Sequence, residues 1–282
     1  MILMIAAFAV AALSLTACGH EGGDEEEGGG VSSSQEYPST ADVIRNAVKD
    51  IDGNKYDAVK IGNQVWMASN LRTTRYADGT SIPLGETFSD ETPYRYAPGE
   101  GQTNEANMVN VKSYGYLYNW PAAMHGASSS SANPSGVQGI CPNGWHVPSY
   151  AEWIELKKYM KTQSIYMASG NIDHLAKALA ATWGWRKSSK EDVPGNDPTT
   201  NNATGFSAVP SGLYRGHHYG LIDGHYDYLY DYFGEDVVFW SSTEYYSNAY
   251  GLGLSYNSAY AQEYTGGIND KDAGFSVRCV RD

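Results

Sequence analysis

Hydrophobic residues divide the chain into three zones. Residues 2–15 form a nearly continuous apolar run, whereas residues 19–34 consist mostly of glycine, serine and acidic side chains. From Tyr37 to Asp282, apolar and polar positions alternate with the spacings of strands and helices. A segment without apolar side chains cannot bury a core. The pattern therefore predicts a leader over residues 1–17, a flexible tether over 18–36 and a single folded domain over 37–282.

A β-hairpin is predicted near the start of this domain. Residues 55–61 and 64–68 have the composition of strands, and Gly62–Asn63 has that of the turn between them. For the preceding stretch, residues 42–49, we predict a short helix or a linker. Residues 50–54 include the fragment D-x-D-G, but the further acidic residue that a calcium loop requires is missing downstream. We therefore predict a tight turn there.

Two helices are predicted in the middle of the chain. Ser149 and Glu152 have the spacing of a capping box, which opens a helix. The apolar face of this helix comprises Trp153, Leu156 and Met160. Asp173 is a candidate cap for the second helix. The apolar side of that helix comprises Leu175, Ala178, Leu179 and Trp183.

Short strand-like stretches follow the second helix. Residues 205–209, 237–241 and 275–280 alternate with loops rich in Gly, Asn, Asp and Tyr. Together the elements predict an α+β domain with two helices, a mixed or antiparallel sheet and long irregular loops.

The leader ends in Leu-Thr-Ala-Cys, which is typical of the lipobox of bacterial lipoproteins. A signal peptidase cleaves before such a cysteine once its sulfur carries a diacylglycerol, so Cys18 would begin the mature protein and anchor it to a membrane. The alternatives are an ordinary secretory signal and a short transmembrane helix. Residues 2–15 are too few to span a bilayer, which takes about 20 residues. We therefore predict lipidation of Cys18.

The net charge and the number of cysteines limit which binding partners and which disulfide we predict. The chain has 19 basic and 32 acidic residues, a net charge of −13. This disfavours binding to nucleic acid or to anionic lipid headgroups, so the predicted membrane contact is the lipid on Cys18. With Cys18 lipidated, Cys141 and Cys279 remain as one candidate disulfide in an oxidising compartment. Two buried free thiols are the alternative.

Tyrosine is unusually frequent, with 23 Tyr against 6 Phe. Residues 212–234 combine tyrosine with Gly, His and Asp, which is typical of surfaces that contact glycans or proteins. The predicted ligand-binding residues are Tyr214, Tyr219, Tyr226, Tyr228, Tyr230 and Tyr232. The alternative is a long β-hairpin packed against the domain. The spacing of His217, His218 and His225 fits no familiar set of metal ligands, so we predict no metal site.

Several sequence blocks occur in a characteristic order. They are DIDGNKYDAVKIGNQVWMASNLRTTRYADGT at 50–80, YGYLYNWPAAM at 114–124, GICPNGWHVPSYAEWIEL at 139–156, ATGFSAVPSGLYRG at 203–216, FWSSTE at 239–244 and GFSVRCVRD at 274–282. In this order they resemble the Fibrobacter succinogenes major paralogous domain. The blocks GWHVPSYAEW and GFSVRCVRD are also similar to the ends of formylglycine-generating enzymes. The resemblance implies a C-type-lectin-like fold and no particular activity.

The same resemblance bears on catalysis and cofactors. Formylglycine-generating enzymes bind copper with two neighbouring cysteines, which this sequence lacks, and no G-x-S-x-G motif occurs. We therefore predict no catalytic residues and no enzymatic activity. Calcium-dependent lectins use Asn and Asp on a strand that here reads Trp240–Glu244, and residues 192–202 have the composition of a polar loop. We predict no cofactor, with calcium as the alternative.

Acidic residues 24–27 resemble the signal that exports Bacteroidetes lipoproteins to the outer face of the outer membrane. The sequence thus predicts a non-enzymatic, lipid-anchored binding module on the cell exterior that recognises a glycan or a host or matrix protein. The alternatives are a structural subunit of a surface assembly such as a pilus tip, and an enzyme whose carboxylates the sequence does not identify.

Overall fold

The computed structural model describes residues 37–100, 103–216, 228–264 and 270–282, which belong to one unit, Tyr37–Asp282. Three of the predicted site residues, Cys18, Tyr219 and Tyr226, lie outside these ranges. No helix within them is long and apolar enough to cross a membrane.

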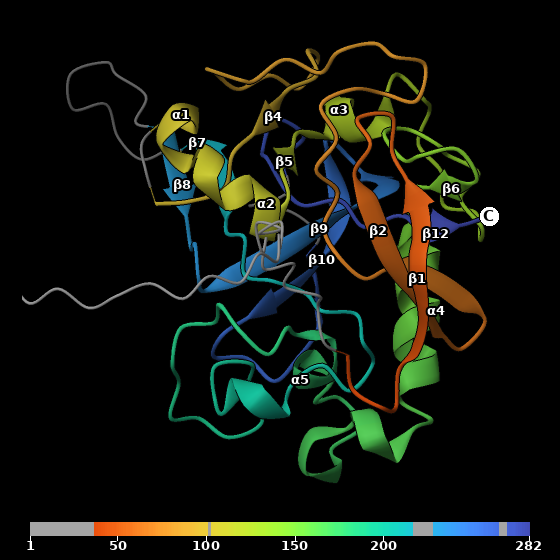
Figure 1. Cartoon of the computed structure of the whole chain (residues 1–282), viewed down its shortest axis with the longest axis vertical. Helices are drawn as coiled ribbons and strands as arrows, with labels where there is room; N and C mark the ends of the chain where they lie inside the picture. The colour runs from red at the N-terminus through yellow and green to blue at the C-terminus, as the bar shows by residue number, and fades with distance from the viewer. Residues whose placement is uncertain (1–36, 101–102, 217–227, 265–269) are drawn as a thin grey trace, which may run out of the picture. The chain divides into compact units, whose positions relative to one another are not determined.

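The unit is a mixed α+β structure built on antiparallel sheets (Figure 1). The largest sheet has the order β1 (Asp42–Lys49), β2 (Lys55–Ile61), β3 (Gln64–Met67), β12 (Val280–Arg281) and β6 (Trp145–His146). The second sheet has the order β11 (Gln262–Tyr264), β10 (Asn248–Ser255) and β9 (Asp236–Tyr245). Two smaller pairs are β4 (Arg95–Tyr96) with β5 (Leu117–Tyr118), and β7 (Leu213–Gly216) with β8 (Tyr228–Asp231). The predicted hairpin around Gly62 is confirmed as β2 and β3.

The helices are mostly short. They are α1 (Asn104–Asn107), α2 (Val111–Tyr114), α3 (Trp120–Met124), α4 (Tyr150–Met160) and α5 (Ala176–Leu179), with 3₁₀ turns at Met108–Asn110, Ser164–Tyr166, Ala168–Gly170 and Pro198–Thr200. The capping box of Ser149 and Glu152 is confirmed at the start of α4. Helix α4 runs alongside the large sheet (Figure 1) and contacts β2, β9 and β10. It therefore joins the two larger sheets.

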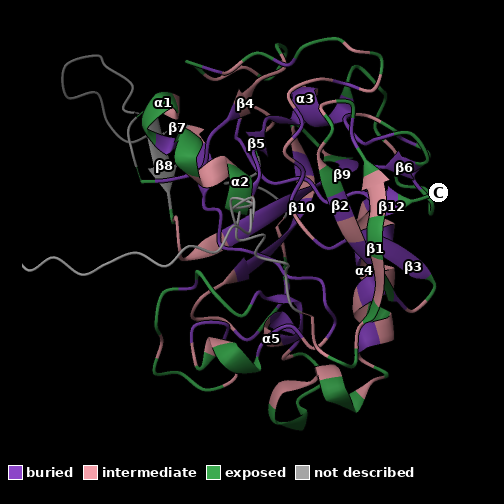
Figure 2. Ribbon diagram, viewed as in Figure 1, coloured by how far each residue is buried: buried purple, intermediate pink, exposed green. Residues whose placement is uncertain are grey.

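Aromatic side chains fill the space between α4 and the sheets. Trp153 of α4 stacks on Trp66 of β3, with ring centroids 4.3 Å apart. Phe206 and Phe239 pack edge-on against each other beside them. Figure 2 shows β3, β9 and β10 as largely buried, whereas β1 is intermediate or exposed along its length. The core therefore lies behind β2 and β3, and β1 forms an outer edge.

The segment 42–49 is a strand, so the prediction of a helix or linker was wrong. Its apolar residues occur in adjacent pairs, Val43 with Ile44 and Ala47 with Val48, which mimics helical spacing. A bulge between Ile44 and Val48 produces this pattern in β1, with Asn46 at a φ of 48°. Residues 45–47 of β1 lie opposite the single residue Asp57 of β2, so two extra residues interrupt the pairing of the strand.

The second predicted helix is shorter than expected. Helix α5 spans four residues, has no side-chain cap, and leaves Asp173 paired with Lys161 at 2.5 Å. The chain turns extended at Ala180, and the next residue donates from its N–H to the carbonyl of Ala208. Because this N–H bonds to another segment and not to the preceding helical turn, the helix ends here. Trp183 lies beyond this end and is 42% exposed. The predicted strands over 205–209 and 275–280 are likewise reduced to isolated bridges and the two residues of β12.

The predicted disulfide between Cys141 and Cys279 is confirmed. Both cysteines are fully buried. The bond ties the loop before β6 to the segment that leads into β12, across 138 residues of sequence.

A buried histidine links three parts of the fold. The Nε2 of His146 lies 2.7 Å from Glu152 Oε1, and its Nδ1 lies 2.7 Å from Asp282 Oδ1. Glu152 also accepts hydrogen bonds from the backbone N–H groups of Ser135 and Ser149. Burial lowers the pKa of His146, but hydrogen bonds to the two carboxylates outweigh it and raise the pKa above its ordinary value. The imidazolium is thus stabilised in the folded state.

This arrangement predicts that alkaline pH weakens the fold. A histidine whose pKa is raised on folding stabilises the protein fully below its unfolded pKa of about 6.5, and the stabilisation is lost as pH rises through the folded value. We expect the free energy of unfolding to fall as the pH rises above about 6.5 and through the raised pKa of His146. A His146→Gln variant should be about 1–3 kcal/mol less stable at the lower pH and should lose this dependence. Urea unfolding at several pH values checks this, and an identical slope in both proteins would contradict it.

Candidate binding site

Of the predicted binding tyrosines, Tyr214 and Tyr232 are the two whose side chains the structure describes, and they differ in exposure. Tyr214 is 3% exposed and stacks on Tyr96 with ring centroids 3.9 Å apart, so we correct its placement from a surface to a buried aromatic cluster. Tyr228 and Tyr230 lie in β8, which pairs with β7 in antiparallel register. The described part of residues 212–234 is thus a β-hairpin, as the alternative interpretation expected.

Tyr232 is the exposed member of that group within the described residues. It is 44% exposed, and the guanidinium of Arg215 lies 5.3 Å from its ring centroid. An N–H of Arg215 also donates to the Tyr232 hydroxyl at 3.2 Å. This tyrosine is held in place by a neighbour, and a single ring offers little area for a ligand.

The oxygen-rich loop over residues 192–202 surrounds a lysine. The ammonium of Lys177 donates to the carbonyls of Asn196, Asp197 at 3.3 Å and Val193 at 3.5 Å. Main-chain oxygens of the loop that was considered for calcium therefore bind the Lys177 ammonium. In the described residues, no group of three or more His, Cys, Asp or Glu side chains is arranged to hold a metal ion.

One pocket combines aromatic, charged and apolar side chains, and we call it the Trp120 pocket. Its volume is about 420 Å³. It is lined by Tyr76, Asp90, Glu91, Pro93, Trp120, Pro121, Met124, His125, Gly126, Ala127 and Lys271. These residues come from four stretches of chain that are far apart in sequence.

Asn119 brings two of these stretches together. Its side-chain oxygen caps α3 by accepting from the N–H of Ala122, and it also accepts from the N–H of Tyr94 at 2.9 Å. Its amide donates to the carbonyls of Ser89 and Thr92, both at 2.8 Å. This fully buried residue therefore fixes the loop that carries Asp90 and Glu91 against α3.

Lys271 joins the pocket through Trp120. The N–H of Trp120 donates to the Lys271 carbonyl at 2.9 Å, and the Lys271 ammonium lies 4.5 Å from the indole ring centroid. The same ammonium is paired with Glu244. The indole N–H donates to the Ser241 carbonyl at 3.0 Å, so contacts with both Lys271 and Ser241 fix the ring.

Tyr76 and His125 form the other aromatic wall. Their rings are stacked, with centroids 3.6 Å apart and planes within 8°. His125 follows the end of α3 in a left-handed conformation, with its side chain 38% exposed. Its Nε2 lies 3.8 Å from a carboxylate oxygen of Asp78, whose pKa is lowered by a hydrogen bond from the N–H of Thr80. An ionised carboxylate thus borders this wall.

The hydroxyl of Tyr76 is the most informative atom of the pocket. Tyr76 is 2% exposed, and its hydroxyl has no hydrogen-bond partner among the described residues. Burial and the nearby Asp78 raise its pKa, so the group stays protonated and can both donate and accept. A buried polar group without a partner costs about 1–3 kcal/mol. Because the hydroxyl has almost no accessible surface, Tyr76 contributes to the pocket wall through its ring.

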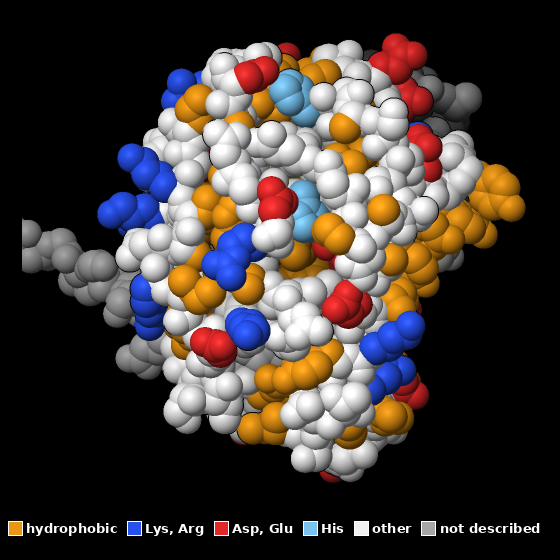
Figure 3. Space-filling model, turned by 90° about the vertical axis from the view of Figure 1, so that its right-hand side faces the viewer, with side chains coloured by type: hydrophobic (Ala, Val, Ile, Leu, Met, Phe, Trp, Pro, Cys, Tyr) orange, Lys and Arg blue, Asp and Glu red, His pale blue; other side chains and the backbone are white. Residues whose placement is uncertain are grey.

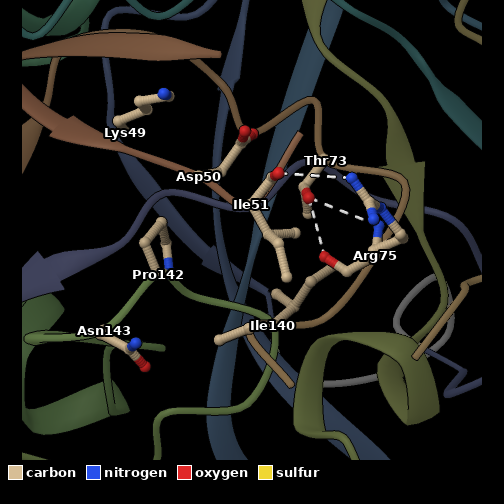
Figure 4. Close-up of a pocket in the computed structure, with 9 residues that line it drawn as sticks. Lys49, Asp50, Ile51, Thr73, Arg75, Ile140, Pro142 and Asn143 are labelled. Carbon is tan, nitrogen blue, oxygen red and sulfur yellow. Dashed lines mark hydrogen bonds between the residues drawn. The ribbon is translucent and has the colours of Figure 1, made fainter. Parts of the chain in front are cut away.

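A second, smaller pocket of about 220 Å³ is lined by Arg75 together with Asp50, Ile51 and Ile140 (Figure 4). Arg75 donates to Asp52 at 2.7 Å and to the Ile51 carbonyl at 3.3 Å. Asp50, on the opposite wall, accepts from Asn54 and from the Tyr56 hydroxyl. Because these charged groups already have partners within the protein, this pocket gives less indication of a ligand.

The sequence did not indicate the Trp120 pocket. The block YGYLYNWPAAM contains its helix, and an Asn followed by Trp-Pro is a recognisable helix start. That signal locates α3, but it does not reveal that residues 76, 90–93 and 271 meet there.

Comparison with known proteins gives one match. The family model described as Fibrobacter succinogenes major domain matches residues 59–281. Neither a curated protein nor a solved structure matches the chain.

Proposed function

The chain belongs to the Fibrobacter succinogenes major domain family, and from the Trp120 pocket we propose that it is a non-enzymatic glycan-binding module of the cell surface. Its fold would be C-type-lectin-like, as the sequence blocks imply. Lipid on Cys18 would anchor it to the outer membrane, facing the exterior, with residues 18–36 as the tether. No cofactor is required by this proposal.

The single observation that carries the proposal is a pocket of about 420 Å³ whose lining combines stacked aromatic rings with exposed carboxylates. Sugar hydroxyls both donate and accept hydrogen bonds, so they are suited to a pocket that offers both kinds of partner. Here the carboxylates of Asp90 and Glu91 accept, and the Lys271 ammonium donates. The ring of His125, which is partly exposed and stacks on Tyr76, adds a flat surface for the C–H faces of a sugar.

The surface charge of the protein favours a ligand that is uncharged, or that carries charges of both signs, over nucleic acid. On the face drawn in Figure 3, acidic and basic side chains are interspersed, and hydrophobic side chains gather along the right-hand edge. With the net charge of −13, this distribution provides little attraction for a polyanion.

A structural role in a surface assembly is the second candidate. Strand β1 is an eight-residue edge of the large sheet, and an exposed edge can pair with another chain. Its bulge at Asn46 and the exposed charges of Asp42, Arg45 and Lys49 are features that hinder such pairing. We therefore rank this role below glycan binding, and catalysis by unidentified carboxylates below both.

A Tyr76→Phe variant separates ligand binding from folding. We expect its affinity for glycan to stay within about twofold of that of the wild type, because the hydroxyl that is removed has almost no accessible surface. Its stability should be unchanged or higher, because the variant lacks a buried hydroxyl without a partner. Calorimetric titration and thermal unfolding measure the two quantities.

The matched control is Tyr118→Phe. The Tyr118 hydroxyl donates to the Thr73 carbonyl at 2.7 Å, so this variant should lose about 1 kcal/mol of stability and keep its affinity. A glycan affinity that falls tenfold or more in Tyr76→Phe would contradict this, because it would show that the ligand reaches the hydroxyl.

A further inference from the structure

We infer that residues 162–172, which we call the 162–172 loop, insert into the surface of the membrane that holds the lipid anchor. The inference rests on the lipidation of Cys18 in the proposed function. It adds a second membrane contact and an orientation, in which the Trp120 pocket points away from the membrane.

The 162–172 loop is uncharged and exposes large apolar side chains. Its eleven residues include no Asp, Glu, Lys or Arg, although 18% of the whole chain is charged. Ile165 and Ile172 are 57% and 51% exposed. Beside the loop, Tyr260 is 48% exposed and its ring centroid lies 5.3 Å from that of His174. An apolar environment would stabilise these side chains relative to water.

The backbone of the loop forms hydrogen bonds mainly with itself. Four N–H groups donate to carbonyls of the loop at 3.0–3.2 Å, namely those of Tyr166, Met167, Gly170 and Asn171. The N–H of Ala168 donates to the carbonyl of His174 at 3.0 Å. Backbone groups that lose their partners in lipid are costly. Because these turns supply their own partners, the loop can enter an apolar layer without leaving those groups unpaired.

Charged side chains flank the loop on both sides. Lys161 precedes it and Asp173 follows it, and the two form an ion pair at 2.5 Å. At a membrane surface such charges lie among the headgroups while apolar side chains reach deeper. The pair is neutral as a whole, so this contact requires no anionic lipid, in agreement with the net charge of −13.

The chain enters the domain at the end that carries the loop. Tyr37 packs against the same buried cluster as Tyr166 and Met167. Figure 1 shows this start, in red, and the segment after α4 at the lower end, whereas α3 of the Trp120 pocket lies at the upper end. The 18 residues 19–36 reach at most about 65 Å. A lipid on Cys18 therefore keeps the loop at high effective concentration near the membrane.

A lipid surface fits the loop better than a second protein does. A specific protein interface buries about 800 Å² on each partner. The exposed parts of Ile165 and Ile172 cover far less than this. Insertion into lipid needs no matching surface, and the lipid anchor already supplies most of the affinity for the membrane.

A fluorophore in the loop tests the inference on the full-length, lipidated chain. Ser164→Cys places it in the loop, and Ser128→Cys places it next to the pocket residue Ala127; both serines are exposed. The labelled chains are reconstituted in phosphatidylcholine vesicles with and without lipid brominated on its acyl chains, which quenches nearby fluorophores. Interfacial segments lie about 5–10 Å into the boundary between headgroups and acyl chains, so we expect quenching of about twofold or more at residue 164. We expect none at residue 128.

Two double variants, each made in the Ser164→Cys chain, locate the effect. Ile165→Ser/Ile172→Ser should abolish the quenching, whereas Ile51→Ser/Val109→Ser, which removes exposed apolar side chains outside the loop, should keep it. A chain that floats with the vesicles without quenching at residue 164 would overturn the inference and leave the anchor intact. Quenching that survives in Ile165→Ser/Ile172→Ser would also overturn it. A chain that does not float with the vesicles would overturn the anchor and the inference together.

Discussion

An Arg278→Met variant is expected to lose about 4 kcal/mol of stability or more. Arg278 is fully buried, and its guanidinium donates to four oxygens: Asn70 Oδ1 at 2.9 Å, the Met67 carbonyl at 2.9 Å, the Ser207 carbonyl at 2.9 Å and the Phe206 carbonyl. Methionine has a similar length but no donor, so these buried oxygens would lose their partner, each at a cost of about 1–3 kcal/mol.

The charge of Arg278 survives burial because of these contacts. Burial lowers its pKa to about 9, so the guanidinium remains protonated at neutral pH. Its carbon lies 4.4 Å from the ring centroid of Phe206 and 5.4 Å from that of Phe239. The arginine thus joins β3, the 206–207 segment and the chain before β12. Losing about 4 kcal/mol removes a large fraction of the 5–15 kcal/mol typical of a domain.

Urea unfolding of residues 37–282 measures this effect. The control is Arg45→Met, because Arg45 is 53% exposed in its ion pair with Asp57, and we expect a change of about 0.5 kcal/mol or less. Equal unfolding midpoints for Arg278→Met and the control would show that the buried network contributes nothing to stability.

Loss of the disulfide is the second large effect that we expect. The bond between Cys141 and Cys279 closes a loop across 138 residues, and the chain-entropy estimate for so long a loop is about 5 kcal/mol. A Cys141→Ala/Cys279→Ala variant should lose about 4–5 kcal/mol relative to the oxidised protein. The native fold around the bond is tight, since both residues are fully buried.

Reduction provides an independent check on the same quantity. The wild type unfolded in urea with a thiol reductant should unfold at a midpoint close to that of the double variant. The double variant itself should be insensitive to the reductant, because residues 37–282 contain no other cysteine. Unfolding exposes the bond to the reductant. An unfolding midpoint of the wild type that is the same with and without reductant would therefore contradict the expected stabilisation.

Local signals in the sequence predicted local structure well. The capping box at Ser149 located α4, and Gly62–Asn63 located the first hairpin, because both depend on residues that are neighbours in the chain. The prediction for residues 42–49 was wrong because the bulge at Asn46 depends on the partner strand, where Asp57 accepts from the Asn46 N–H at 2.7 Å.

The binding site depends on contacts that the sequence pattern does not contain. Asn119 joins the 89–94 loop to α3 through bonds to residues about 25 to 30 positions away. Dense tyrosines over residues 212–234 suggested a surface, but Tyr214 packs on Tyr96, more than a hundred residues earlier. Composition therefore identified an aromatic-rich segment without showing which rings face a ligand.

The most direct test of the account is binding of the full-length chain to a glycan array, with the Trp120 pocket open or filled. Ala127 is exposed and lines the pocket, so Ala127→Trp would fill it. Ala132 is exposed outside the pocket and serves as the control, as Ala132→Trp. The account predicts that wild type and Ala132→Trp bind the same glycans, with or without a calcium chelator, and that Ala127→Trp binds none. Unchanged binding by folded Ala127→Trp, or no binding by the wild type, would contradict it.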